Sequence, residues 1–233
     1  RGVAVTASGS SCASAISYFQ AQKTIPDWER TRRKGQSAEL QVRHLLASAA
    51  LPIIFPAEQI GNEYFGDGGM RMVAPLSPAI HLGANNILVI GTRDEKPDMS
   101  PDEPVEYPSA GEIGGYLMDT IFMDTLNADL ARMRRINKTM KLVPEQLRGQ
   151  AGLKNIESLV IKPSKDVRDI TRAHVRDIPF SVQVLLRTLG GWGRDWRMAS
   201  YLLFESAYCA ELIDLGYQDG MNSEQDIVSF LKP

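Results

Sequence analysis

Cysteine and histidine are scarce in this sequence, and neither is grouped. The 233 residues include two cysteines, Cys12 and Cys209, and three histidines. The cysteines lie in unrelated contexts without CxxC spacing, which argues against a disulfide framework and a zinc site, so we expect two buried free thiols. No HExxH pattern places two histidines on one helix face. We therefore expect neither a metal nor a cofactor.

The sequence also lacks an excess of charge and a long apolar run. Its 26 Lys and Arg against 28 Asp and Glu give a net charge of -2. Phosphate binding usually needs a strongly basic face, so we expect no nucleic-acid partner. No apolar run approaches the roughly eighteen residues that cross a bilayer. With 43% hydrophobic and 23% charged residues, the composition is that of a soluble folded protein, and the length favours one α/β core.

The sequence opens on a β-prone run. Gly2 leads directly into residues 3–7, which predict a core strand without a preceding linker or start methionine. We therefore expect the chain to begin inside a domain, so it offers no expectation about a signal peptide of the intact protein. A second β-prone run, residues 16–19, follows the small polar segment 8–14. The two runs predict a hairpin.

The rest of the chain predicts helices around further strands. Residues 26–35 have the character of a charged connector. Residues 86–91 are continuously apolar and β-branched, which is typical of a strand buried on both faces of a parallel sheet. Residues 156–161 predict another strand. Helical patterns occupy residues 37–49, 78–82, 113–140, 181–189, 198–215 with Gly216 as C-cap, and 222–231 with an Asn-x-x-Gln capping pattern.

Asp67-Gly68-Gly69 is the most informative tripeptide of the chain. An aspartate before two glycines suits the end of a strand, because glycine lets the backbone turn through positive φ and lets another chain approach closely. The extended residues 63–65 ahead of it support that position. Alone, Asp-Gly-Gly is most often a plain surface turn.

The sequence around this turn is more specific. Residues 44–56 run from a helix into prolines (HLLASAALPIIFP), and residues 75–79 (PLSPA) and 82–84 (LGA) lead into a hydrophobic strand. This order resembles the patatin-like phospholipases, in which A-S-x-A-x-P-x-x-F-P precedes a strand, Asp-Gly-Gly, P-x-x-P-A, Leu-Gly-Ala and a strand. The resemblance is close over residues 40–91. The tail from Gly111 resembles, less specifically, the helical extension of bacterial members.

The resemblance implies an α/β fold, a three-layer α/β/α sandwich with a helical C-terminal extension. Residues 1–163 would be the C-terminal part of the patatin-like catalytic domain, and residues 164–233 the extension packed on the same domain. Asp67 would be the catalytic aspartate of a Ser-Asp dyad, and Gly68 and Gly69 would shape its turn.

The reaction implied is lipid acyl hydrolysis, as in a phospholipase or esterase of lipid degradation. A serine would attack a fatty-acyl ester, Asp67 would assist proton transfer without a histidine, and water would resolve the acyl-enzyme. Glycine-rich backbone amides would form the oxyanion hole. The implied partners are a lipid or acyl-ester substrate, a membrane surface and the N-terminal half of the same protein. The implied location is the cytoplasm, with peripheral membrane contact.

The sequence departs from the family in lacking the Gly-x-Ser-x-Gly nucleophile elbow and the glycine-rich oxyanion loop. The nearest substitute, residues 9–13 (GSSCA), has alanine in place of the second glycine and falls in the predicted hairpin turn. We therefore expect no nucleophile in this chain. The serine would lie upstream of Arg1 in the intact protein, and the chain alone would be inactive.

Several weaker features have a structural and a functional interpretation. The basic run 30–34 (RTRRK) is a solvated face or a contact for lipid head groups. His81 is a packed or surface histidine rather than a base. Trp192 and Trp196 pack against helices or form an interfacial lip. The apolar stripe of residues 113–140 is core or a lid over an acyl site, and core is favoured.

Two other functions compete with hydrolysis. The main rival is a non-catalytic α/β interaction module in which Asp67 is only a turn residue. A nucleotide-binding Rossmann-like domain ranks last, because no Gly-x-Gly-x-x-Gly turn follows the first strand.

Overall fold

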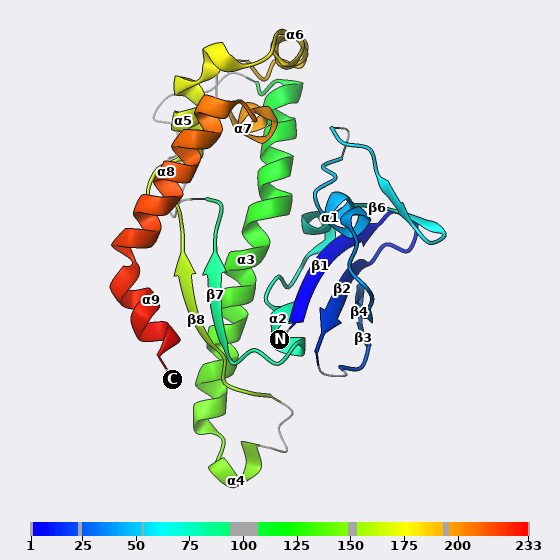
Figure 1. The fold of residues 1–233 in the computed structure, drawn as a ribbon, viewed down its shortest axis with the longest axis vertical. Helices are drawn as coiled ribbons and strands as arrows, with labels where there is room; N and C mark the ends of the chain where they lie inside the picture. Colours follow the sequence, from blue (N-terminus) through cyan, green and yellow to red (C-terminus); the bar gives the residue numbers. More distant parts are fainter. Residues whose placement is uncertain are drawn as a thin grey trace. The chain divides into compact units, whose positions relative to one another are not determined.

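The computed structural model describes residues 2–22, 25–52, 54–93, 107–148, 153–192 and 196–232. The chain forms two compact units, Arg1–Ile87 with Asp124–Glu157, and Leu88–Met123 with Ser158–Pro233. We call them unit 1 and unit 2. Strands dominate the first part of the ribbon and helices the last part (Figure 1). The fold is therefore mixed α/β, with a central sheet and helices, as predicted.

A six-stranded sheet forms the centre of unit 1, in the order β3-β4-β2-β1-β6-β5. Its strands are β1 (Gly2–Gly9), β2 (Ala15–Ala21), β3 (Trp28–Arg30), β4 (Arg33–Ser37), β5 (Glu58–Ile60) and β6 (Glu63–Asp67). Neighbouring strands are antiparallel except β2 and β4, which are parallel. The β1–β2 pair confirms the predicted hairpin, with Gly2 opposite Ala21 and Ser8 opposite Ala15.

Short helices complete unit 1: α1 (Val42–Ser48), the 3-10 helix η1 (Gly68–Arg71), α2 (Ser77–His81) and α4 (Glu145–Arg148). Ala47 of α1 packs with Ala7, Tyr18 and Phe65 of the sheet into a buried cluster. The odd-numbered side chains of β1 therefore face α1, because side chains alternate along a strand. On the segment before α2, Leu76 N donates a hydrogen bond to Asp129 Oδ2 at 3.1 Å.

Residues 26–35 are not a connector, because they contain β3 and most of β4. The ring of Trp28 covers Gly35 so closely that a Cβ there would lie 2.1 Å from the ring. Trp28 also stacks on Phe19, with ring centroids 4.9 Å apart. Glu29, Arg30 and Lys34 of this ribbon are exposed. The ribbon joins the sheet through the pairing of β4 with β2 and through Trp28 over Gly35.

The helix predicted from residue 37 begins later. Ser37 is still in β4, opposite Phe19. Ala38 N then donates to Phe19 O at 2.9 Å, which prolongs the extended conformation. The helix starts at Val42, after Gln41 as N-cap.

Three elements cross from one unit to the other: β7 (Asn86–Ile90), α3 (Ala110–Leu142) and β8 (Glu157–Ile161). They confirm the predicted strands and the long helix. Hydrogen bonds from Glu157 N to Asn85 O and from Gly91 N to Ile161 O show that β7 and β8 run in the same direction (Figure 1).

The prediction that residues 86–91 are buried on both faces is wrong. Burial alternates along β7: Ile87 and Val89 are buried, whereas Leu88 and Ile90 are exposed. The strand pairs only with β8 in a two-stranded sheet of the described chain. A continuous apolar run therefore does not distinguish a strand covered on one face from a fully covered one.

Unit 2 is mainly helical, with α5 (Val167–Ala173), η2 (Val175–Asp177), α6 (Phe180–Thr188), α7 (Arg197–Leu202), α8 (Ser206–Asn222) and α9 (Glu224–Leu231). Trp192 and Trp196 pack against its core and meet edge to face at 5.4 Å. This confirms their packing role. The core residues are Ile170, Ile178, Leu186, Ala199, Leu203, Tyr208 and Leu215.

The C-terminal helices differ from the predicted boundaries. The predicted helix 198–215 is broken between Leu202 and Ser206, and α8 then passes through Gly216 to Asn222. Leu203, at the break, is 1% exposed and packs in the core. The helical spacing of apolar residues in the sequence does not predict this break. Asn222 ends α8 and does not cap α9, so the capping pattern is also misassigned.

The prediction of two buried thiols is wrong. Cys12 is exposed in the β1–β2 turn, and Cys209 is half-buried in α8. Both are free. The polar turn keeps Cys12 at the surface, where its neighbours Ser10 and Ser11 are also exposed.

His174, between α5 and η2, joins two carboxylates in unit 2. Its Nδ1 lies 2.8 Å from Asp177 Oδ2, and its Nε2 lies 2.7 Å from Glu211 Oε2. An ionised carboxylate only accepts, and both ring nitrogens can donate only when the ring is protonated, so this pair of contacts favours the imidazolium form. The hydrogen bonds to Asp177 and then Glu211 raise the pKa of His174.

We predict that His174 stabilises the fold at low pH and loses that effect as the pH rises. Its contribution should be complete below the ordinary pKa of about 6.5 and should fade as the pH passes the raised folded pKa. Melting temperatures of wild type and His174→Gln should therefore differ most near pH 5.5 and converge at higher pH. Glu211→Gln should weaken this pH dependence. A pH-independent difference between wild type and His174→Gln would contradict the prediction.

Candidate functional site

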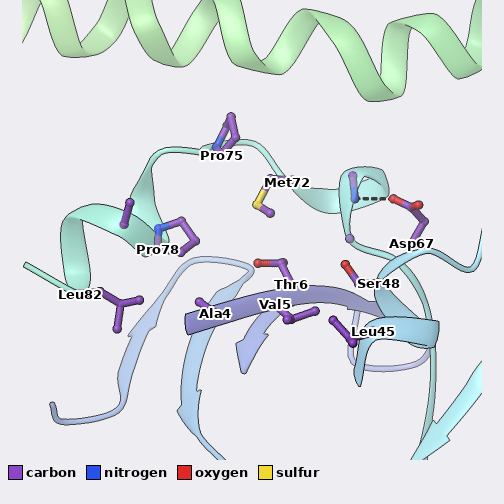
Figure 2. A pocket seen from close by; sticks show the side chains of 13 residues that line it. Ala4, Val5, Thr6, Leu45, Ser48, Asp67, Met72, Pro75, Pro78 and Leu82 are labelled. Carbon is purple, nitrogen blue, oxygen red and sulfur yellow. Dashed lines mark hydrogen bonds between the residues drawn. The ribbon is translucent and has the colours of Figure 1, made fainter. Parts of the chain in front are cut away.

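Asp67 is the last residue of β6 and lies opposite Ala7 of β1. Its backbone N donates to Ala50 O at 2.9 Å, which ties the strand end to the segment after α1. Its Oδ1 accepts a hydrogen bond from Gly69 N at 2.8 Å (Figure 2). The carboxylate therefore caps η1 through one oxygen.

Gly68 allows the chain to leave β6 directly beside β1. A Cβ at Gly68 would lie 2.1 Å from Thr6 O, so a larger residue requires the backbone to shift. Ser8 Oγ also donates to Gly68 O at 3.2 Å. Neither Gly68 nor Gly69 has positive φ, so the prediction of a left-handed turn is wrong. The close approach of two backbone segments, which was also predicted, explains the glycine at position 68.

Asp67 lines a pocket of about 600 Å³ in unit 1. The pocket lies between β1, the end of α1 and the segment through α2 (Figure 2). Its lining includes Gly68 and Gly69. The hydroxyl of Thr6 is hydrogen-bonded to Ser17 Oγ at 2.8 Å. The apolar lining residues are Ala4, Val5, Leu45, Met72, Pro75, Pro78, Ala79 and Leu82.

The pocket makes Asp67 a better proton acceptor than an exposed aspartate. Burial raises the pKa of Asp67, and the hydrogen bond from Gly69 N opposes part of that rise. Desolvation disfavours the charged carboxylate, so proton uptake becomes easier. Asp67 is also the only ionisable side chain that lines this pocket in the described part of the chain.

Ser48 is a polar pocket residue that the sequence prediction missed. It ends α1, and Figure 2 shows its hydroxyl pointing toward the pocket, on the side where Asp67 lies. The Ser48 hydroxyl makes no hydrogen bond within the described residues. Ser48 is the serine of the A-S-x-A-x-P pattern, so the sequence did mark this position. The pattern alone does not show which way the side chain points.

The serines of the segment 9–13, the nearest substitute for an elbow, lie outside the Asp67 pocket. Ser10 and Ser11 are in the exposed β1–β2 turn, where Ser10 Oγ donates to Tyr64 O and Ser11 Oγ donates to Glu63 Oε1, both at 2.8 Å. Neither lines the Asp67 pocket. Residues 9–13 therefore form a hairpin turn rather than a strand-to-helix elbow.

His81 is a packed histidine outside the pocket lining. Its ring stacks on Trp28 at 4.5 Å, with 8° between the planes. Burial and then the nearby Arg30 and Arg33 lower the pKa of His81. The basic run 30–34 lies on the β3–β4 ribbon, where Lys34 pairs with Glu29 at 2.9 Å.

The described residues hold no group of three or more His, Cys, Asp and Glu side chains that could bind a metal ion. No described helix is both long and apolar enough to cross a membrane.

Comparison with known proteins gives one match. The family described as patatin-like phospholipase matches residues 9–80, which is less than half of the chain. The matched segment includes Ser48, Asp67 and most of α2, and it supports the resemblance to this family. No curated protein and no solved structure matches the chain.

We predict that Gly68→Ala destabilises the protein by about 1–3 kcal/mol, because the added methyl group meets Thr6 O and a crowded site must rearrange. Gly216→Ala is the matched control. Its Cβ meets nothing within 4 Å, so it should stabilise α8 by about 0.5–1 kcal/mol. Urea unfolding of both variants gives the comparison. A Gly68→Ala variant as stable as wild type would show that the contact between residue 68 and Thr6 O leaves room for a methyl group.

Proposed function

We propose that this chain is the part of a lipid acyl hydrolase that carries the aspartate of a Ser-Asp dyad. The observation that carries the proposal is a desolvated carboxylate, Asp67, in a largely apolar pocket. A pocket of this kind suits an acyl ester, because apolar walls bind the acyl chain and few polar groups orient the reacting bond. The family match over residues 9–80 supports the same reading.

In the proposed reaction a serine attacks the ester carbonyl while Asp67 takes the serine proton. The proton then passes to the leaving alcohol as the carbon–oxygen bond breaks and the acyl-enzyme forms. Asp67 next accepts a proton from the water that attacks the acyl-enzyme carbonyl. The proton passes to the serine oxygen as the bond between that oxygen and the acyl carbon breaks, which releases the fatty acid and restores the serine. Gly69 N fixes Oδ1 of the carboxylate, so Oδ2 is the oxygen proposed to accept the proton.

The serine and the oxyanion hole are proposed to come from the N-terminal half of the same protein. Residues 1–163 would then complete a three-layer α/β/α catalytic domain of patatin type, and residues 164–233 would be its helical extension. Asp67, Gly68 and Gly69 are the residues of this chain assigned to the catalytic turn. The dyad itself calls for no metal or cofactor.

The proposed substrates are phospholipids or related acyl esters. Such substrates sit in membranes, so contact with a membrane surface from the cytoplasm is part of the proposal. The basic run 30–34 lies on an outer strand ribbon of the sheet. Anionic head groups would be its ligands there.

The rival function is a non-catalytic interaction module. One observation favours it: the bond from Gly69 N to Asp67 Oδ1 is the bond that an ordinary turn aspartate makes. In that case the carboxylate has a structural role only. The two functions differ in what happens when a serine-bearing segment is present.

We predict that the 233-residue chain alone neither hydrolyses p-nitrophenyl butyrate nor reacts with a fluorophosphonate probe. A carboxylate without a nucleophile offers only modest general-base assistance. The intact polypeptide with its Gly-x-Ser-x-Gly segment should do both. Its Ser→Ala variant at that motif is the control and should lose both activities.

Two results would contradict this prediction. An intact polypeptide that is folded but unreactive would favour the interaction module. Labelling of the isolated chain would place the nucleophile within it, and mass spectrometry of the labelled peptide would distinguish Ser48, in the Asp67 pocket, from Ser10 and Ser11 in the turn.

A further inference from the structure

Helix α8 of unit 2 carries apolar side chains on two opposite faces. Its inner face holds Tyr208 and Leu215, which belong to the core of unit 2. On its other side, Ile213, Tyr217 and Met221 are spaced by four residues, so they form one stripe along the helix. At about 100° per residue, Leu215 lies almost opposite Ile213 and Tyr217. The stripe therefore points away from the core.

The stripe is exposed to solvent. Ile213 and Tyr217 are each 70% exposed, and Met221 is 50% exposed. Helix α9, which follows α8 along the ribbon (Figure 1), adds the exposed side chains of Val228 and Leu231. A surface helix usually has polar residues on its outer face, whereas a helix that is apolar on opposite sides is usually covered on both. The outer face of α8 therefore has the character of an interaction surface.

Two glycines of α8, Gly216 and Gly220, border the stripe. A Cβ at either position would meet nothing within 4 Å in the described part of the chain, and neither residue has positive φ. Glycine weakens a helix relative to alanine, and no internal contact requires it here. Small residues on a helix surface let the backbone of a second helix approach closely. The glycines therefore indicate the same kind of neighbour as the stripe does.

The charge around the stripe indicates which partner fits. Residues 206–231 contain no lysine or arginine, and their acidic residues are Glu211, Asp214, Asp219, Glu224 and Asp226. Asp214, three residues before Tyr217, is exposed, as are Glu224 and Asp226. Like charges disfavour a second copy of this face and an anionic membrane. The acidic surroundings instead complement a basic partner.

The shape of the stripe favours a helix as that partner. A row of side chains spaced by four residues forms a ridge, and such a ridge packs into the groove of another helix. We infer that the outer face of α8 is the docking surface for one basic amphipathic helix of a partner protein. The apolar side of that helix covers Ile213, Tyr217 and Met221, and its lysine or arginine side chains face Asp214. This docking does not depend on the reaction proposed for Asp67.

The test uses the 233-residue chain and a fluorescein-labelled peptide, Lys-Leu-Ala-Lys-Lys-Leu-Ala-Lys-Lys-Leu-Ala-Lys-Leu-Ala-Lys-Lys-amide, followed by fluorescence anisotropy. Its leucines lie on one helical face between lysines, so the peptide should bind. Two control peptides should bind at least about tenfold more weakly. One has the same composition with the leucines on all sides of the helix, and the other has glutamate in place of every lysine.

Two variants of the chain locate the binding surface. Tyr217→Ser should weaken peptide binding at least about tenfold, because a large aromatic side chain leaves the centre of the contact. Tyr116→Ser is the matched control: Tyr116 is an exposed tyrosine of α3, 61% exposed against 70% for Tyr217. It should bind the peptide as wild type does.

Gly220→Ala separates docking from damage to the fold. The added methyl group meets nothing in the described residues, so the melting temperature should not fall. It occupies space that the partner's backbone needs, so binding should weaken at least about fivefold.

Four results would overturn the inference. The first is a chain that does not bind the peptide, and the second is equal binding of the peptide with scattered leucines, which would show charge attraction alone. The third is a Tyr217→Ser or Gly220→Ala variant that binds as wild type does. The fourth is another occupant: a dimer in sedimentation that Tyr217→Ser separates, or binding to phosphatidylcholine–phosphatidylserine vesicles that Tyr217→Ser abolishes.

Discussion

The close contact between Gly68 and the backbone of Thr6 is the constraint on which the candidate site depends. At that point β6 stops pairing with β1, and the chain turns into η1 with Asp67 at its start. Only a residue without Cβ lets the two backbones come this near. The position of Asp67 at the mouth of η1, beside β1, follows from this approach.

The electrostatics of the site follow from its geometry. The sheet, α1 and the segment around α2 enclose Asp67 with mostly apolar side chains, so burial raises its pKa. A single backbone donor, Gly69 N, holds one carboxylate oxygen, Oδ1, and does not engage the other. A structural turn aspartate would use the same bond, but it gains nothing from the largely apolar pocket beside its carboxylate. That juxtaposition is the main reason to favour chemistry over a structural role.

Sequence reasoning succeeded where local pattern determines local structure. The β1–β2 hairpin, the extended residues before Asp67 and the long helix α3 each carry a clear period. It failed where distant contacts decide. Pairing with β2 and the contact of Trp28 with Gly35 place a charged segment in the sheet. Leu203 enters the core at a break between helices. The role of Gly68 and the direction of the Ser48 side chain likewise depend on residues far away in sequence. The Asp-Gly-Gly motif therefore indicated where the candidate site lies, but it did not predict how its side chains are arranged.

The central claim, that Asp67 accepts a proton in catalysis, is tested most directly by kcat of Asp67→Asn in the intact protein. Asparagine is nearly isosteric and still accepts from Gly69 N, so the melting temperature should be close to that of wild type. It cannot take the serine proton, so kcat on a short-chain acyl ester should fall on the order of a hundred- to ten-thousand-fold. A folded variant within about threefold of wild-type kcat would remove Asp67 from the catalytic role.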